Sequence, residues 1–222
     1  RDLLVGAVEV DDPISVNHGM LNHSELINHK AVVFNNIPES DGLRSAVNVL
    51  ARDRLCEIFN ISPGELIDVL AWAMANPSEP QLVDSKDAPV LENTQECVDL
   101  TKLPIPWHYP EDRGRYQSAS VIIAEYQGVR NMSFHRQLLR DETHLVVRLV
   151  PRHLHSMTGE ARNSGEEVKI AVINAPDPVV LLAAAMSFDS NIDELTIASA
   201  LHEKIHGSPP VSYTHLTLPT KA

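Results

Sequence analysis

The chain has 222 residues, of which 43% are hydrophobic, and this length suits one large or two small globular domains. Its 30 acidic residues outnumber its 18 basic ones, and the net charge of -12 opposes binding to a phosphate backbone. No apolar run reaches the roughly 20 residues of a membrane span. We therefore expect no nucleic-acid partner, no membrane partner, and a small-molecule ligand.

The cysteine content indicates the compartment. Cys56 and Cys97 lie far apart and lack the paired spacing of a zinc cluster or a disulfide framework. Two unpaired cysteines fit a reducing environment, so we expect a cytoplasmic protein.

The first half of the sequence predicts an α/β domain over residues 1–95. The apolar run AVVFNNI at 31–37 is typical of a strand, and residues 43–60 carry apolar side chains at helical spacing. A second helix is expected over 62–77, with Ser62 as its N-cap and Glu65 completing a capping box. Prolines and a polar linker follow, which places the domain boundary near residue 95.

The second half, residues 96–211, predicts mostly strands and then two helices. Strands are expected at 116–126, 144–150 and 168–174, a pattern that suits a small β-barrel with helical additions. Asp177 and Pro178 mark the start of one helix. Residues 191–205 carry apolar side chains on one face of the second helix.

The stretch NMSFHRQLL at 131–139 is unusually polar for a core strand. In a strand, Asn131, Ser133 and His135 share one face because side chains alternate between faces. Such alternation also occurs in any half-exposed strand. Arg136 would lie on the opposite face from Asn131 unless a bulge or a strand end intervenes.

Four motifs occur in one order: DLTKLPIPWHYPEDRGRY, NMSFHRQ, VPRHL and DPVVLLAAAMSFDSNIDELTIASAL. Together they resemble the UbiD family of decarboxylases, which use prenylated FMN, over residues 30–210. The resemblance implies an α/β (α+β) fold with an N-terminal α/β domain and then a split β-barrel similar to flavin reductases. A C-terminal domain of the family has no counterpart in this sequence.

The resemblance also implies a metal site and a cofactor site. Asn131, His153 and Glu194 match the metal ligands, a mostly hard set suited to Mn²⁺ or Mg²⁺, with K⁺ as an optional further ion. Arg136 matches the catalytic arginine, which would hold the substrate carboxylate. The cofactor contacts implied by the family match are Ser118, Ser133, Arg136, Arg152, Ala185 and Met186.

Each assignment has a structural alternative. Glu194 could be the third residue of a capping box that begins at Asn191. His153 could be a histidine of a surface loop. Arg136 could pair with Asp141 or Glu142.

The implied function is decarboxylation of an α,β-unsaturated acid, and the PRHLH form is most similar to the archaeal branch that acts on anhydromevalonate phosphate in isoprenoid synthesis. The alternatives are an aromatic or acrylic acid decarboxylase and a flavin-binding module without decarboxylase activity. A flavin prenyltransferase would supply the cofactor, and the full-length form is expected to be a homo-oligomer.

The end of the sequence carries two further expectations. SYTHLTLPTKA, residues 212–222, resembles translated adapter DNA, so we expect a non-native tail. The family's general acid is expected beyond residue 211. The 222-residue chain is therefore expected to be inactive by itself.

Overall fold

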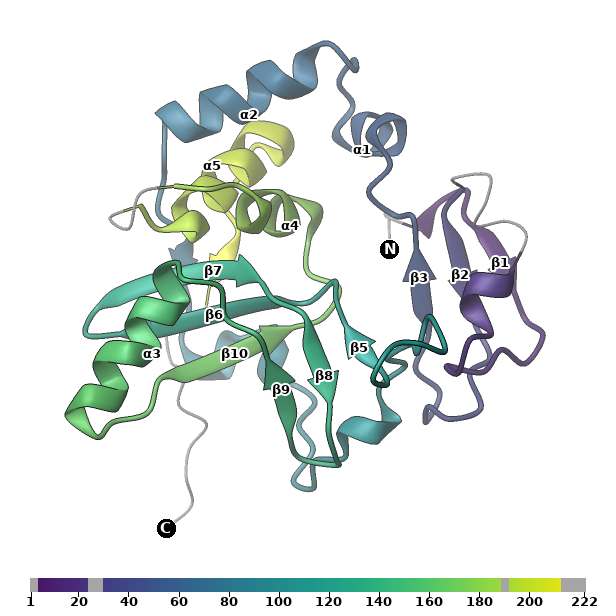
Figure 1. The fold of residues 1–222 in the computed structure, drawn as a ribbon. Helices are drawn as coiled ribbons and strands as arrows, with labels where there is room; N and C mark the ends of the chain where they lie inside the picture. The colour runs from purple at the N-terminus through teal and green to yellow at the C-terminus, as the bar shows by residue number, and fades with distance from the viewer. Residues whose placement is uncertain (1–3, 24–29, 189–191, 213–222) are drawn as a thin grey trace. The chain divides into compact units, whose positions relative to one another are not determined.

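The computed structural model describes residues 4–23, 30–188 and 192–212, which fall into two compact units (Figure 1). The units alternate along the chain, whereas the sequence predicted one boundary near residue 95. The first comprises Arg1–Pro63, Gln95–Ser118 and Arg136–Val147, and the second comprises Gly64–Thr94, Ala119–His135 and Arg148–Ala222. The mixture of helices and strands confirms the predicted fold class, while the domain limits and the split barrel stay predictions.

Over its described residues, the first unit contains two three-stranded sheets, one helix and two 3₁₀ turns. In one sheet β2 lies between a parallel β1 and an antiparallel β3, and in the other β8 lies between antiparallel β5 and β9. The elements are β1 (Val8–Val10), η2 (Met20–Asn22), β2 (Val32–Phe34), β3 (Ser45–Val47), α1 (Arg52–Phe59), η6 (Leu100–Lys102), β5 (Tyr116–Gln117), β8 (Gln137–Leu139) and β9 (Leu145–Val147).

The helix predicted over residues 43–60 is wrong in its first half. Ser45–Val47 forms β3, and Val47 packs against the core cluster of this unit. Asn48 then has a φ of 57°, in the left-handed region, which a continuous α-helix cannot contain. The helix α1 begins only at Arg52 and ends at Asn60, as the sequence predicted.

The second unit contains a three-stranded antiparallel sheet in the order β10-β6-β7, a short parallel pair β4-β11, and most of the helices. Its elements are α2 (Glu65–Ala75), β4 (Gln81–Leu82), η4 (Ser85–Asp87), η5 (Pro89–Leu91), β6 (Val121–Tyr126), β7 (Val129–Phe134), α3 (His153–Ser164), β10 (Lys169–Ile173), α4 (Pro178–Ala185), α5 (Glu194–His206) and β11 (Val211–Ser212).

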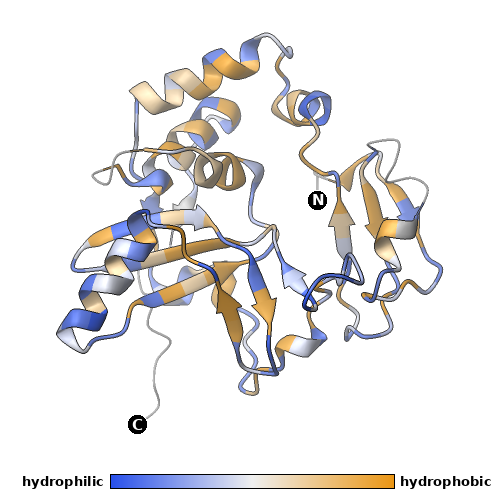
Figure 2. Ribbon diagram, in the orientation of Figure 1, coloured by the Kyte–Doolittle hydropathy of each residue, from blue (hydrophilic) through white to orange (hydrophobic). Residues whose placement is uncertain are grey.

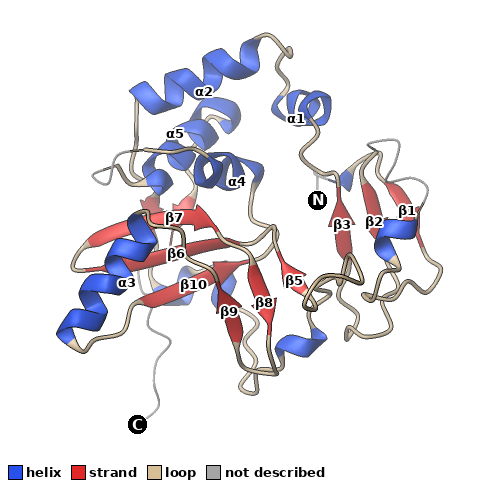
Figure 3. Cartoon of the chain, viewed as in Figure 1, coloured by secondary structure: helices blue, strands red, loops and turns tan. Residues whose placement is uncertain are grey.

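Helices α4 and α5 pack on each other and on β7, whereas α3 packs on β6 (Figure 3). The central strand β6 is hydrophobic over most of its length, and α4 is apolar all round its axis (Figure 2). A helix without a polar face is stable in water only when neighbours cover it. The core of this unit therefore lies between β6, β7, α4 and α5.

The start of α4 follows the predicted chemistry. Asp177 caps α4 by accepting a hydrogen bond from the Val179 backbone N–H at 3.0 Å, with Pro178 as the first helical residue. The N-cap predicted at Ser62 is wrong, because α2 begins at Glu65 and its N-cap position is Gly64, which has helical dihedral angles.

The stretch at 131–139 is two strands. Strand β7 ends at Phe134 and β8 begins at Gln137, so the strand end expected between Asn131 and Arg136 is confirmed. The VPRHL motif leads directly into α3, whose first residue is His153.

Two smaller predictions have clear outcomes. Cys56 and Cys97 form no disulfide, as expected. Among the described residues, no helix combines the length and apolarity needed to cross a bilayer. Residues 213–222 of the predicted non-native tail lie outside the described residues, whereas Ser212 pairs with Leu82.

Candidate functional site

Polar side chains gather in the second unit, where β7 meets the start of α5. Asn131 and Glu194 are both buried, with 5% and 3% of their surfaces exposed. The Asn131 Nδ2 group donates to Glu194 Oε1 at 2.9 Å, and the Met132 backbone N–H donates to Oε2 at 2.9 Å. A buried carboxylate is tolerable only when it is hydrogen-bonded, and here both oxygens are.

The electrostatics of this carboxylate are unusual for a glutamate. Burial raises the pKa of Glu194, because a charged carboxylate loses its hydration in the interior. The Met132 N–H and a positive charge on His153 act in the opposite direction and lower this pKa. Glu194 thus lies in a place that favours a nearby cation.

The hydrogen bonds fix the orientation of the Asn131 amide. Only its nitrogen can donate to a carboxylate, so the Asn131 Oδ1 atom faces the other way. There Oδ1 accepts a hydrogen bond from the Ser133 hydroxyl at 3.0 Å. The same hydroxyl lies 3.0 Å from His135 Nε2, and burial lowers the pKa of His135.

An ion pair also connects β7 to the start of α5, and the sequence analysis did not predict it. Arg130 Nη1 lies 3.0 Å from Asp193 Oδ2, and the other Asp193 oxygen caps α5 through the Leu195 N–H at 2.9 Å. Arg130 also lies 3.7 Å from Glu125 on β6. The one feature of the sequence that could have indicated Arg130 is that it directly precedes Asn131.

The capping-box alternative for Glu194 is wrong. Helix α5 begins at Glu194 itself and has Asp193 as its N-cap, so Glu194 is the first helical residue. Asn191, the expected start of the box, lies outside the described residues. The Glu194 side chain instead turns inward to β7.

His153 lies half-buried at the N-terminus of α3, which makes it a helix residue and not a loop residue. Its charge affects Glu194, so the two side chains are electrostatically coupled. An amide oxygen, an imidazole and a carboxylate are a donor set that Mn²⁺ or Mg²⁺ accepts. Glu194 keeps free lone pairs for such an ion, since a carboxylate has about four acceptor positions.

A second group of predicted residues lies at the ends of α3 and α4. Arg152 is the N-cap of α3 and donates through Nη1 to the Ser187 hydroxyl at 3.0 Å. Ala185 is the last residue of α4, and Met186 is its C-cap. The hydrogen bond therefore connects Arg152 to the segment that contains Ala185 and Met186.

Ser118 and Arg136 are exposed and belong to the first compact unit. Within the described part of the chain, Arg136 forms no ion pair, so the expected pairing with Asp141 or Glu142 is not present. Asp141 instead contacts His144 at 2.7 Å and Arg140 at 3.9 Å. The roles of Ser118 and Arg136 at the site stay predictions.

Comparisons with known proteins find similarity to decarboxylases. Residues 81–222 match the family described as UbiD, 3-octaprenyl-4-hydroxybenzoate carboxy-lyase Rift-related domain. The chain is 32% identical over 199 residues to the anhydromevalonate phosphate decarboxylase of Methanothermobacter thermautotrophicus. The aligned region covers 89% of this chain and 46% of that protein. It is 26% identical over 187 residues to the gallate decarboxylase of Lactiplantibacillus plantarum, covering 78% of this chain and 38% of that protein.

Solved structures agree in fold. The chain superimposes with a TM-score of 0.85 and 28% identity on an evolved dimeric form of the UbiD-class enzyme HmfF from Pelotomaculum thermopropionicum in complex with prFMN. That match covers 97% of this chain and 51% of the other. The chain spans less than half the length of the anhydromevalonate phosphate decarboxylases that it matches, at 46% and 36% for two of them.

Proposed function

Because the chain belongs to the UbiD family, we propose that the whole protein is a carboxy-lyase that uses prenylated FMN to remove CO₂ from an unsaturated carboxylic acid. The observation that carries this proposal is the buried contact between Asn131 and Glu194. Loss of the set Asn131, His153 and Glu194 would favour a flavin-binding module without decarboxylase activity, and all three residues are present.

In this proposal, Asn131, His153 and Glu194 hold a divalent cation, with Mn²⁺ or Mg²⁺ as the ion and K⁺ as an optional second one. The Asn131 amide presents its nitrogen to Glu194 and its oxygen to Ser133, so an ion held by both Asn131 and Glu194 would require this amide to rotate. Arg152 and the segment 185–187 would contact the cofactor, and the ion would connect the cofactor phosphate to the protein.

The chain's own residues then perform binding and orientation. When bound, prenylated FMN supplies the electron sink for the pair left by departing CO₂. Arg136, which is exposed and free of its nearby acidic neighbours, would hold the substrate carboxylate through two parallel hydrogen bonds. Ser118 and Ser133 would contact the cofactor. The general acid is not assigned to any residue of this chain.

The proposed substrate is trans-anhydromevalonate 5-phosphate. The support is the higher identity to anhydromevalonate phosphate decarboxylases, 32% and 34%, than to the gallate decarboxylase, 26%. An aromatic acid is the second candidate because the gallate enzyme also matches over 78% of the chain. We propose that the whole protein is a homo-oligomer, and the dimeric form of HmfF supports this. The proposal also places the protein in the cytoplasm. A flavin prenyltransferase would supply its cofactor.

The test is reconstitution of the whole protein, in its full-length form, with prenylated FMN, Mn²⁺ and K⁺, followed by measurement of CO₂ release. Anhydromevalonate phosphate, gallate and 4-hydroxybenzoate would be compared at equal concentration. Release from the first acid alone would support the proposed substrate, and release from an aromatic acid alone would replace it. Flavin retention without release from any acid would favour the binding module.

A further inference from the structure

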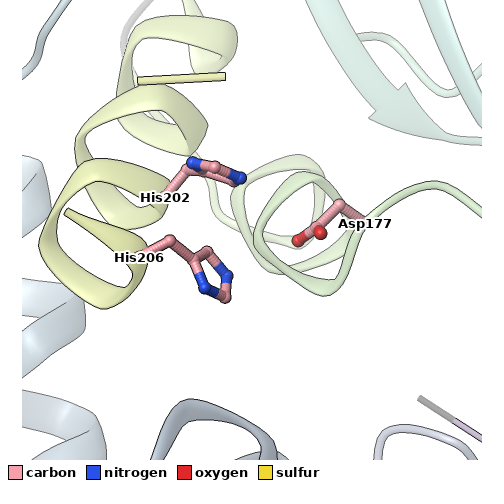
Figure 4. A group of neighbouring side chains, drawn as sticks. All are labelled: Asp177, His202 and His206. Atoms are coloured by element: carbon pink, nitrogen blue, oxygen red, sulfur yellow. The ribbon is translucent and has the colours of Figure 1, made fainter. Parts of the chain in front are cut away.

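A second group of metal-binding side chains lies at the opposite end of α5. His202 and His206 are one helical turn apart in the last two turns of α5, and Asp177 precedes α4, which packs beside it. One ligand atom from each of the three lies within 4.8 Å of the others. Figure 4 shows both imidazoles and the carboxylate directed toward the same space.

The spacing of the two histidines is the helical spacing of known zinc sites. Residues four apart share one helix face, and His202-Glu203-Lys204-Ile205-His206 has the order His-Glu-x-x-His. The two rings lie with their centroids 4.6 Å apart. The sequence analysis did not single out this motif, although its spacing is readable there.

The hydrogen bonds leave the required atoms free. His202 Nδ1 lies 2.7 Å from the Ser208 carbonyl oxygen, which can only accept, so Nδ1 carries the proton and Nε2 has its lone pair for a metal. Such a carbonyl partner on the second nitrogen is the usual support of a metal-bound histidine. Asp177 Oδ1 accepts the Val179 N–H, and Oδ2 remains for a metal.

The C-terminal end of α5 favours a cation, whereas the N-terminus of α4 beside Asp177 opposes one. The last carbonyls of α5 carry partial negative charge at this end of the helix, where cations are stabilised. Asp177 adds a full negative charge. Asp177 and His206 are exposed and His202 is half-buried, so an ion can enter from solvent.

The distances require a modest adjustment. In a tetrahedral zinc site the ligand atoms lie roughly 3.4 Å from one another, given metal–ligand distances of about 2.0–2.1 Å. The three atoms here lie within 4.8 Å of one another, so they must approach by at most about 1.4 Å. Exposed side chains can do this by changing rotamers.

We propose that Asp177, His202 and His206 form a second metal site, which binds Zn²⁺ or a similar late transition-metal ion with three protein ligands and one open position. Two imidazoles and one carboxylate select this class of ion over Mn²⁺ or Mg²⁺. The bound ion would connect the C-terminal turn of α5 to the start of α4. The site shares no residue with Asn131, His153 and Glu194.

The test is zinc titration of the metal-free 222-residue protein against a chromophoric chelator at neutral pH. His206→Gln, His202→Gln and Asp177→Asn would be compared with the parent. Asparagine is as good an N-cap as aspartate, so Asp177→Asn removes the charge and keeps the cap of α4. His155→Gln is the matched control, because His155 is an exposed helix histidine outside the cluster.

The expected result is one zinc equivalent that becomes at least tenfold weaker in all three cluster variants and is unchanged in the control. Glu194→Gln should retain this equivalent, which separates the site from the proposed cofactor site. Co²⁺ should give visible d–d absorption that disappears in His206→Gln. Circular dichroism should show that each variant is folded. Zinc binding that is absent in the parent, or unchanged in His206→Gln and His202→Gln, would overturn the proposal.

Discussion

Helix α5 carries metal-binding side chains at both ends, and the two ends differ in burial. At the first residue, Glu194 is buried and both of its oxygens accept hydrogen bonds from β7. In the last two turns, His206 is exposed and His202 is half-buried, with its Nδ1 atom hydrogen-bonded to the Ser208 carbonyl. A buried site is preorganised and contributes to the fold, whereas an exposed site adds an ion to a fold that is already formed.

This difference leads to different expectations for substitution. Changes at the buried end should affect metal, cofactor and stability together, because the same hydrogen bonds serve all three. Changes at the exposed end should affect metal alone.

Glu194→Gln should weaken Mn²⁺ binding by about 10²-fold or more and reduce retention of prenylated FMN after desalting. The change removes one negative ligand, and loss even of an outer-sphere partner costs 10–100-fold. Glu203→Gln on the exposed face of the same helix is the control and should retain both metal and flavin. Equal retention in the two variants would contradict the role of Glu194.

Arg136→Lys should reduce the turnover of the reconstituted whole protein by about 10²-fold and leave flavin retention close to that of the parent. Lysine keeps the charge but lacks the planar pair of donors that positions a carboxylate. Steady-state kinetics with absorbance of the bound flavin would measure the two effects separately. A variant with normal kcat would remove Arg136 from the catalytic assignment.

Asn131→Asp should destabilise the metal-free protein by about 2 kcal/mol near neutral pH, since it replaces a buried hydrogen bond to Glu194 with two facing carboxylates. Added Mn²⁺ should recover part of this loss, because the cation neutralises the pair. Urea unfolding with and without Mn²⁺ would measure both. Asn93→Asp, at an exposed position, is the control and should change neither value appreciably.

The pH dependence of stability gives a smaller effect with a definite sign. Burial raises the pKa of Glu194 in the folded protein above the ordinary value of about 4.3. At a pH between the ordinary pKa and the raised pKa, the folded protein therefore binds more protons than the unfolded chain. The contribution of Glu194 to the free energy of unfolding therefore falls as the pH rises through this range. The metal-free parent should lose stability relative to Glu194→Gln as the pH rises above about 4.3.

Urea unfolding of both proteins at several pH values, with a chelator present, would show this divergence. Saturating Mn²⁺ should reduce it, because the ion favours the charged carboxylate. Parallel curves for the parent and the variant would show that Glu194 is not the group responsible.

Local sequence signals predicted some elements of the fold well. Asp177 and Pro178 marked the start of α4, and Asn60 marked the end of α1. They failed at Ser45–Val47, because helical spacing of apolar residues cannot reveal that β2 offers a strand partner there. The alternation of the two compact units along the chain is a tertiary property that no local pattern contains.

Sequence motifs likewise predicted some residues of the candidate site and not others. The motifs identified Asn131 and Glu194, whose side chains meet although 63 positions separate them. They did not identify Arg130 and Asp193, because an ion pair between a strand and an N-cap has no spacing rule. The His202 and His206 pair does follow a spacing rule, because residues four apart share one face of a helix.

The most direct test of the account is whether one imidazole, that of His153, binds the divalent cation at the Asn131 and Glu194 contact. Pulsed electron paramagnetic resonance of Mn²⁺ bound to protein with ¹⁵N-labelled histidine would detect such a nitrogen. The account predicts a single histidine coupling that is lost in His153→Gln and retained in His155→Gln and His206→Gln. A coupling that persists in His153→Gln, or no histidine coupling in the parent, would contradict it.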